Sequence, residues 1–182
     1  MPDSPIILVS GPPGAGKSTV ARLLVASSTG PVAYIEGDTF WHFIAKSRPS
    51  VNKGEARKEN ACIVIGAMVA SAVRYASGGY PTVLDFTIGP WVLASILPKM
   101  KETPLDYVVL CPSLAVCAER SAGRVEGAMP DYSPYNELHA AFGKLGSFEQ
   151  YAIRNDTADA AELARQIGAG LETGAYRVNA SR

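Results

Sequence analysis

One glycine-rich segment near the start of the chain constrains the fold more than any other part of the sequence. It reads Gly11-Pro12-Pro13-Gly14-Ala15-Gly16-Lys17-Ser18 and fits G-x-x-x-x-G-K-[ST] without a mismatch. Residues 6–9 are an apolar run typical of a strand. Residues 19–26 place apolar side chains at helical spacing. The motif requires the order strand, loop and helix, so the sequence predicts a phosphate-binding turn here.

We call residues 11–18 the phosphate loop. Glycines allow backbone N–H groups to turn inward, and the following helix points its positive end at an anion. Lys17 should reach the β- and γ-phosphates of a nucleoside triphosphate, and Ser18 should offer its hydroxyl to Mg²⁺. The expected nucleotide contacts are Gly11, Gly14, Ala15, Gly16, Lys17, Ser18 and Thr19. The alternative is a glycine-rich turn without a ligand.

Length and composition indicate one globular domain over residues 1–182. Hydrophobic residues make up 47% of the chain and charged residues 19%. The 17 basic and 17 acidic side chains balance, so the formal net charge is zero. Without a basic tract or clustered basic face, a nucleic-acid partner is not expected.

The three cysteines form no C-x-x-C pair. They are Cys62, Cys111 and Cys117, in apolar settings, so we expect buried thiols in a reducing compartment. No cationic leader is seen, and no apolar run approaches the roughly 20 residues of a membrane span. We therefore expect a soluble, cytoplasmic protein with no membrane partner.

Strand and helix patterns alternate along the chain. Strands are expected at 6–9, 32–35, 81–86 and 106–110, with a short fifth strand within 148–153. Helices are expected at 19–26, 40–46, 55–76, 91–100 (interrupted by Pro98), 113–121 and 136–145, with a last helix capped by Asp156 or Thr157 and running to 171. This alternation predicts an α/β fold, a parallel sheet with helices on both faces. Residues 123–134 are expected to form a mobile loop, and residues 172–182 to be partly disordered.

Two acidic residues follow expected strands. Asp38 comes shortly after the second strand, and Asp85 ends the third. Ligands bind at that edge of an open α/β sheet. Asp38 could orient a hydroxyl and accept its proton, or it could only cap the next helix. Asp85 could hold Mg²⁺, contact an acceptor substrate or form a turn.

Two arginines, Arg120 and Arg124, stand at i and i+4 before the expected loop. They are one helical turn apart, so both could project from one face where the helix meets the loop. Arginine pairs with phosphate oxygens and stacks on rings. The alternative is a pair of solvated charges that favour the helix C-terminus.

The phosphate loop, Asp38 and the Arg-x-x-x-Arg pattern together resemble small-molecule kinases of the nucleoside-monophosphate-kinase type. Gluconate kinase, shikimate kinase and chloramphenicol phosphotransferase are similar members, and the resemblance covers about residues 5–171. It implies a three-layer α/β fold with a five-stranded parallel sheet in the order 2-3-1-4-5. It also implies a LID loop at about 121–134, ATP and Mg²⁺ as cofactors, and a small-molecule hydroxyl acceptor.

The resemblance also implies roles for individual residues. Asp38 would face the acceptor hydroxyl, Arg120 the adenine or the phosphates, and Arg124 the transferring phosphoryl group. Residues 155–157 would lie beside the adenine. The chain departs from the gluconate kinases at 124–129, where their histidine and Ser-Gln pair are missing, and from the shikimate kinases at 86–89, where their glycine triplet is missing.

The acceptor cannot be identified from the sequence. Candidates for its pocket wall are Trp41, Phe43, Arg48 and Trp91, although aromatic residues are more often core. We expect an ATP-dependent phosphotransferase acting on a sugar acid, a metabolite or an antibiotic, as a monomer or homodimer. Alternatives are a toxin-like or nucleotide-sugar kinase, a P-loop ATPase and a nucleotide-binding regulatory protein. A guanine-reading switch is disfavoured, because residues 52–55 end in Glu where Asp is needed.

Overall fold

A computed structural model describes residues 4–45, 55–100, 103–125 and 127–178. Within these residues, five parallel strands form one sheet in the order β2-β3-β1-β4-β5, which confirms the predicted topology. The strands are β1 (Ile6–Ser10), β2 (Ala33–Glu36), β3 (Thr82–Asp85), β4 (Leu105–Leu110) and β5 (Ala152–Ile153). The fifth strand is shorter than expected, because a 3₁₀ helix, η2 (Gly146–Tyr151), occupies most of the predicted segment.

The central strands are buried on both faces. Every residue of β3 and β4 is buried, and each strand contains an apolar run, Val83-Leu84 in β3 and Tyr107-Val108-Val109-Leu110 in β4. Such runs are typical of parallel strands covered by helices on both sides. The sheet therefore forms the middle layer of three.

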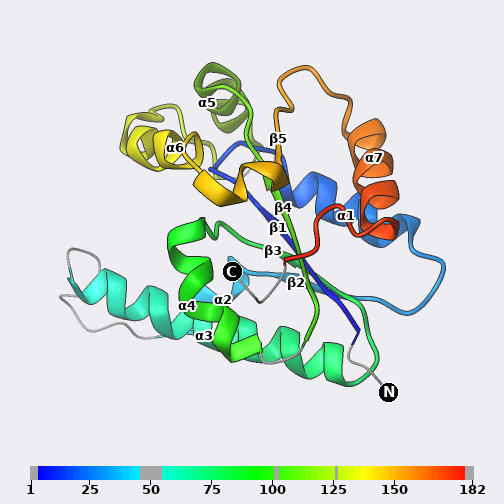
Figure 1. Ribbon diagram of the computed structural model, residues 1–182. Helices are drawn as coiled ribbons and strands as arrows, with labels where there is room; N and C mark the ends of the chain where they lie inside the picture. Colours follow the sequence, from blue (N-terminus) through cyan, green and yellow to red (C-terminus); the bar gives the residue numbers. More distant parts are fainter. Residues whose placement is uncertain (1–3, 46–54, 101–102, 126, 179–182) are drawn as a thin grey trace.

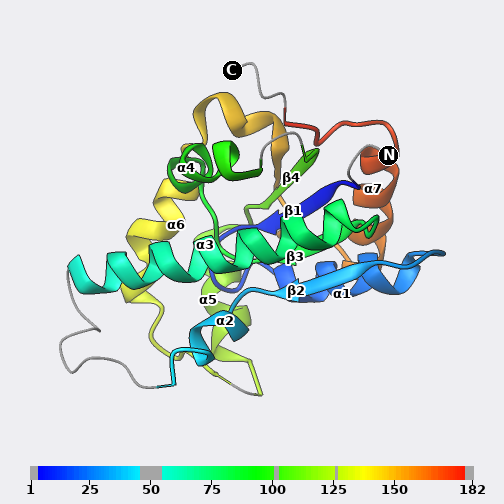
Figure 2. The ribbon, with the colours of Figure 1, turned by 90° about the horizontal axis from the view of Figure 1, so that it is seen from below.

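Helices form the outer layers (Figure 1). α1 and α7 pack together over one face, and α3 and α4 cover the other, as the second view also shows (Figure 2). α5 and α6 lie beyond the carboxyl ends of β1 and β4 (Figure 1). The bounds are α1 (Lys17–Ser27), α2 (Thr39–His42), α3 (Glu55–Ser77), α4 (Pro90–Met100), α5 (Leu114–Ala122), η1 (Ser133–Tyr135), α6 (Asn136–Phe142) and α7 (Ala160–Glu172).

Two helix details differ from the sequence prediction. Pro98 does not interrupt α4, which continues to Met100. Asp159 caps α7, accepting hydrogen bonds from the next turn, so the predicted caps Asp156 and Thr157 were wrong. Ser113 caps α5 as predicted.

α3 is the longest helix of the described residues. Its segment Glu59–Ser77 is long and apolar enough to cross a membrane by length and composition, which the sequence analysis had not recognised. In the fold, however, Met68 and Val69 pack in the core on one face of the sheet. Cys62 is exposed on this helix, contrary to the expectation of a buried thiol, whereas Cys111 and Cys117 are buried.

The end of the described chain docks on β4. The Tyr107 amide donates to the Tyr176 carbonyl at 2.8 Å, and the Val178 amide donates to the Leu105 carbonyl at 2.8 Å. Arg177 forms two hydrogen bonds with buried Asp106 at 2.9 and 3.0 Å. Residues 173–178 are therefore held in place, although we expected partial disorder over 172–182; residues 179–182 lie outside the described residues.

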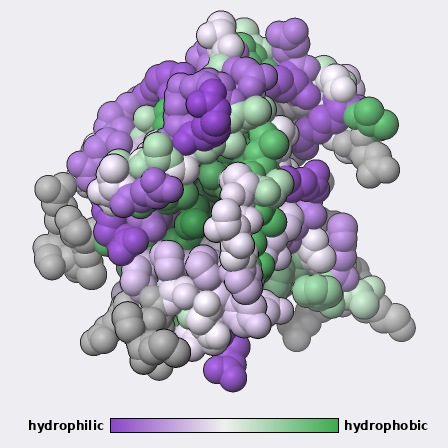
Figure 3. Space-filling view, turned by 90° about the vertical axis from the view of Figure 1, so that its right-hand side faces the viewer, coloured by the Kyte–Doolittle hydropathy of each residue, from purple (hydrophilic) through white to green (hydrophobic). Residues whose placement is uncertain are grey.

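The molecular surface is mixed. On the face shown in Figure 3, hydrophobic residues gather in a recessed band across the middle, with strongly hydrophilic residues above it. This mixture of polar and apolar surface is ordinary for a soluble domain.

Candidate functional site

The phosphate loop joins β1 to α1 at the carboxyl edge of the sheet. Gly14 and Gly16 have φ angles of 77° and 94°, which strongly favour glycine. A Cβ on Gly11 would lie 2.3 Å from the Leu110 carbonyl oxygen, and one on Gly14 would lie 2.3 Å from that of Cys117. Backbone packing thus explains why these positions are glycines.

Lys17 is the centre of a cluster of charges. Its Nζ donates to the Pro12 carbonyl at 3.2 Å. Burial lowers the pKa of Lys17, while the nearby carboxylates of Asp85 and Asp38 raise it and the Arg124 guanidinium lowers it. The fold therefore brings these four predicted site residues into one electrostatic neighbourhood.

Asp85 is only 4% exposed at the end of β3. Burial raises its pKa, and a hydrogen bond from Ser18 and the charge of Lys17 oppose this shift. The Tyr34 hydroxyl donates to Asp85 Oδ2 at 3.4 Å. Tyr34 was missed by the sequence analysis, because nothing in the β2 pattern marks a residue that will meet a neighbouring strand's acid.

The pair Ser18 and Asp85 fits a magnesium site completed by phosphates. Mg²⁺ is usually held by one or two carboxylates plus substrate phosphates rather than by a protein cage. In the described part of the chain, no group of three or more His, Cys, Asp or Glu side chains could hold a metal alone. The Ser18 hydroxyl acts to lower the pKa of the Asp85 carboxyl, so the two side chains belong to one site.

Asp38 stands just before α2 and is exposed. It occupies the N-cap position, yet its side chain makes no capping hydrogen bond. Its charge acts on the pKa values of both Lys17 and Asp85. The capping alternative therefore has no support in the structure, and the carboxylate lies within electrostatic range of the phosphate loop.

The two arginines do not share a helix face, so that prediction was wrong. α5 ends at Ala122, and Arg124 lies beyond it. Arg120 donates to the backbone carbonyls of Asn155 and Asp156, both at 3.1 Å. Arg124 is exposed and close enough to Lys17 to lower its pKa.

The predicted mobile loop is anchored at its far end. Tyr132 is 6% exposed, and its hydroxyl donates to the Pro13 carbonyl at 2.7 Å. The Met129 amide donates to the Ser121 carbonyl at 3.0 Å. Val125, in contrast, is fully exposed. The end of this loop is thus pinned to the phosphate loop, which the sequence did not predict.

Two further side chains reach the phosphate loop from distant segments. Thr87 Oγ1 donates to the Gly11 carbonyl at 3.1 Å, from the segment after β3. Asn155 Nδ2 donates to the Ala15 carbonyl at 2.9 Å. The resemblance placed 155–157 beside a nucleotide base but gave no hint of this side-chain contact.

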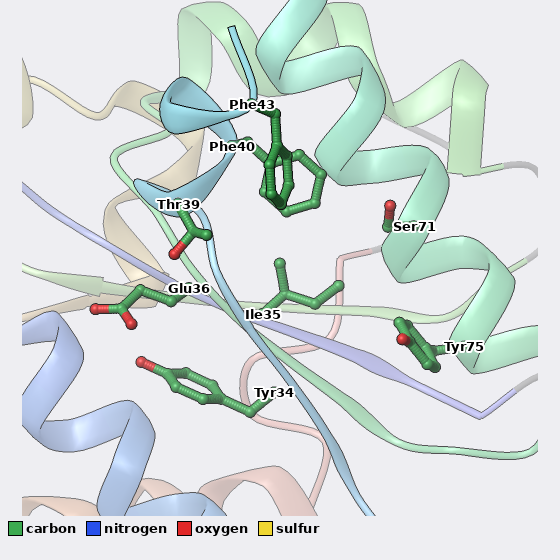
Figure 4. Close-up of a pocket in the computed structure, with 8 residues that line it drawn as sticks. All are labelled: Tyr34, Ile35, Glu36, Thr39, Phe40, Phe43, Ser71 and Tyr75. Atoms are coloured by element: carbon green, nitrogen blue, oxygen red, sulfur yellow. The ribbon is translucent and has the colours of Figure 1, made fainter. Parts of the chain in front are cut away.

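A cavity of about 400 Å³ lies beside the edge strand β2 (Figure 4). Phe40 and Phe43 of the α2 segment project over it, opposite Ser71 and Tyr75 of α3, with Ile35 between them (Figure 4). The remaining lining residues are Tyr34, Glu36 and Thr39.

Of the predicted wall residues, Phe43 lines this cavity. Trp41 packs against the core, and Trp91 covers Gly89 and lies edge-on to the Phe142 ring at 5.3 Å. Arg48 lies outside the described residues, as does the segment 52–55 compared with guanine-reading motifs, apart from Glu55 in α3.

Comparisons with known proteins support the fold. A family model described as "AAA domain" matches residues 6–140. No curated protein shows a significant match to the chain.

Solved structures share the fold at low sequence identity. The tunicamycin resistance protein of Deinococcus radiodurans is 21% identical, with 92% of this chain and 95% of that chain covered and a TM-score of 0.67. A sugar kinase from Janibacter sp. HTCC2649 is 17% identical, with coverage of 94% and 95% and a TM-score of 0.66. A gluconokinase from Sinorhizobium meliloti 1021 is 21% identical, with coverage of 96% and 95% and a TM-score of 0.62.

Proposed function

Because the chain belongs to the AAA domain family and has the fold of P-loop kinases, we propose that it is a small-molecule kinase. It would transfer the γ-phosphoryl group of ATP to a hydroxyl of a soluble small molecule in the cytoplasm. The observation that carries the proposal is the charge cluster around Lys17, in which Asp85, Asp38 and Arg124 all act on one lysine of the phosphate loop.

The phosphate loop would bind the phosphates of ATP. Its amides and Lys17 would bind the β- and γ-phosphates, which requires Lys17 to leave the Pro12 carbonyl. Ser18 and Asp85 would hold Mg²⁺, which when bound neutralises phosphate charge. Arg120 would keep the 155–156 backbone in place beside the base, because it already holds both carbonyls.

In the transfer step, Asp38 would accept the proton of the acceptor hydroxyl. The acceptor oxygen forms a bond to the γ-phosphorus, while the bond from that phosphorus to the β–γ bridging oxygen breaks and its electron pair leaves with ADP. The Asp38 carboxylate orients the hydroxyl and takes its proton. Arg124 contacts the phosphoryl oxygens, where an arginine can contribute about 10³–10⁵ in rate.

A screen for acceptor-dependent ADP release tests the proposal. The panel should contain sugars, gluconate, other hydroxylated metabolites and hydroxylated antibiotics including tunicamycin, because a sugar kinase, a gluconokinase and a tunicamycin resistance protein share the fold. We expect at least one compound to stimulate ADP release and to gain a phosphoryl group by mass spectrometry. Lys17→Ala serves as the inactive control.

ADP release that no acceptor stimulates would indicate an ATPase instead. ATP binding without hydrolysis or transfer would indicate a nucleotide-binding regulatory protein.

A further inference from the structure

Side chains donate hydrogen bonds to the backbone carbonyls of the phosphate loop. Four of them accept hydrogen bonds from side chains, and three of those side chains belong to segments far away in the sequence. The pairs are Thr87 with Gly11, Lys17 with Pro12, Tyr132 with Pro13, and Asn155 with Ala15.

Holding a carbonyl also orients the next amide. The peptide bond is planar and, throughout the described residues, trans, so its C=O and N–H point in opposite directions. A donor behind the Pro13 carbonyl therefore directs the Gly14 N–H toward the other side, and a donor behind the Ala15 carbonyl does the same for the Gly16 N–H.

These two amides are among those that remain for a ligand, together with the unpaired amides of the first turn of α1. Pro12 and Pro13 have no N–H group, and the Ala15 amide donates to the Pro12 carbonyl at 3.2 Å. For the amides of Gly14 and Gly16, the described part of the chain offers no hydrogen-bond acceptor.

Packing holds the Tyr132 side chain in the position from which it donates to the Pro13 carbonyl. Its ring is buried, it packs against the Tyr135 ring at 5.6 Å, and it shares a hydrogen bond with the thiol of Cys117. Burial raises the pKa of the Tyr132 hydroxyl, so it stays protonated and able to donate to Pro13.

The Asn155 side chain is buried and donates one hydrogen bond, to the Ala15 carbonyl. It is 3% exposed, and its Oδ1 has no partner among the described residues. Burying an amide oxygen without a partner is unfavourable, so the site tolerates a cost that the bond to Ala15 helps to offset. Arg120 holds the Asn155 backbone at the same time.

We propose that Tyr132 and Asn155 are positioning residues of the phosphate loop, which hold the Pro13 and Ala15 carbonyls outward so that the Gly14 and Gly16 amides face the phosphates. The inference rests on the proposed function only in placing phosphates at this loop. It predicts that each residue acts on a different amide, Tyr132 on Gly14 and Asn155 on Gly16.

The first test removes single hydroxyls. Tyr132→Phe keeps the ring and loses the bond to Pro13, and we expect ADP affinity, measured calorimetrically without Mg²⁺, to fall by about 3- to 10-fold, as for one neutral hydrogen bond. Tyr135→Phe is the matched control, because its ring lies beside that of Tyr132, and it should bind ADP like the parent.

The second test measures the mobility of the Gly14 and Gly16 amides directly. In ¹⁵N relaxation measurements without nucleotide, Tyr132→Phe should lower the order parameter of the Gly14 amide from about 0.85 toward 0.6 and leave Gly16 unchanged; Asn155→Ala should do the reverse.

Three results would overturn the inference. They are ADP affinity within twofold of the parent in Tyr132→Phe, a lowered melting temperature with unchanged affinity, and equal effects of both variants on both amides. If the parent binds ADP and shows this pattern but phosphorylates no acceptor, the inference stands and the proposed function fails.

Discussion

The phosphate loop and the segment after β2 are built in opposite ways. The loop is packed against neighbouring backbone, and distant side chains hold its carbonyls. The segment 38–45 begins with exposed Asp38, contains a four-residue helix with no buried residue, and ends near Phe43, which is 69% exposed. One side of the site is therefore preorganised, and the other is open.

This difference matches what each side has to recognise. Every triphosphate presents the same phosphate oxygens, so a fixed set of donors serves them all. Acceptors differ in shape, and the open segment is where a common scaffold can vary its substrate. The comparison predicts that changes on the phosphate side affect all acceptors equally, whereas changes near α2 affect them selectively.

Apart from the inactive Lys17→Ala control, the largest effect on the phosphate side should come from Arg124→Ala. We expect phosphoryl transfer to the acceptor found in the screen to slow by about 10³–10⁵, because Arg124 would lose its contact with the transferring group. Single-turnover kinetics at saturating ATP measure this step. Arg154→Ala is the control, since Arg154 pairs with Glu149 on the surface. A rate within a few-fold of the parent would remove Arg124 from the site.

A smaller effect is expected from a change at Asp85, beside Ser18 of the phosphate loop. Asp85→Asn keeps the size of the side chain but removes a charge beside Ser18, so we expect Mg²⁺ to bind the nucleotide complex about 10–100-fold more weakly, the range typical of changes around metal sites. A Mg²⁺ titration of ATP binding measures this, with metal-free ATP binding as the internal control. Unchanged Mg²⁺ dependence would mean that Asp85 does not hold the metal.

The sequence predicted the parts of the molecule that depend on local pattern or on family resemblance. The phosphate loop has a spacing of its own, and the strand order followed from resemblance. Tyr34, Thr87 and Tyr132 were not predicted, because a lone polar side chain that meets a distant backbone or carboxylate has no periodicity to mark it.

Helix ends were also only partly predictable. Gly123 follows α5 and separates Arg124 from the helix, although the spacing alone suggested one continuous face. Asp159 rather than Asp156 caps α7, because the Asp156 side chain instead accepts a hydrogen bond from the Ser113 amide at 2.9 Å. The second outcome depends on a tertiary contact that sequence spacing does not contain.

Asp38→Asn provides the most direct measurement of the central claim, which is that an alcohol is aligned by this carboxylate with a triphosphate on the phosphate loop. ATP affinity and the single-turnover rate of transfer should be measured on the same preparation. The account predicts affinity within twofold of the parent and a transfer rate lower by about 10²–10⁴. Transfer at the parent rate in this variant would contradict it.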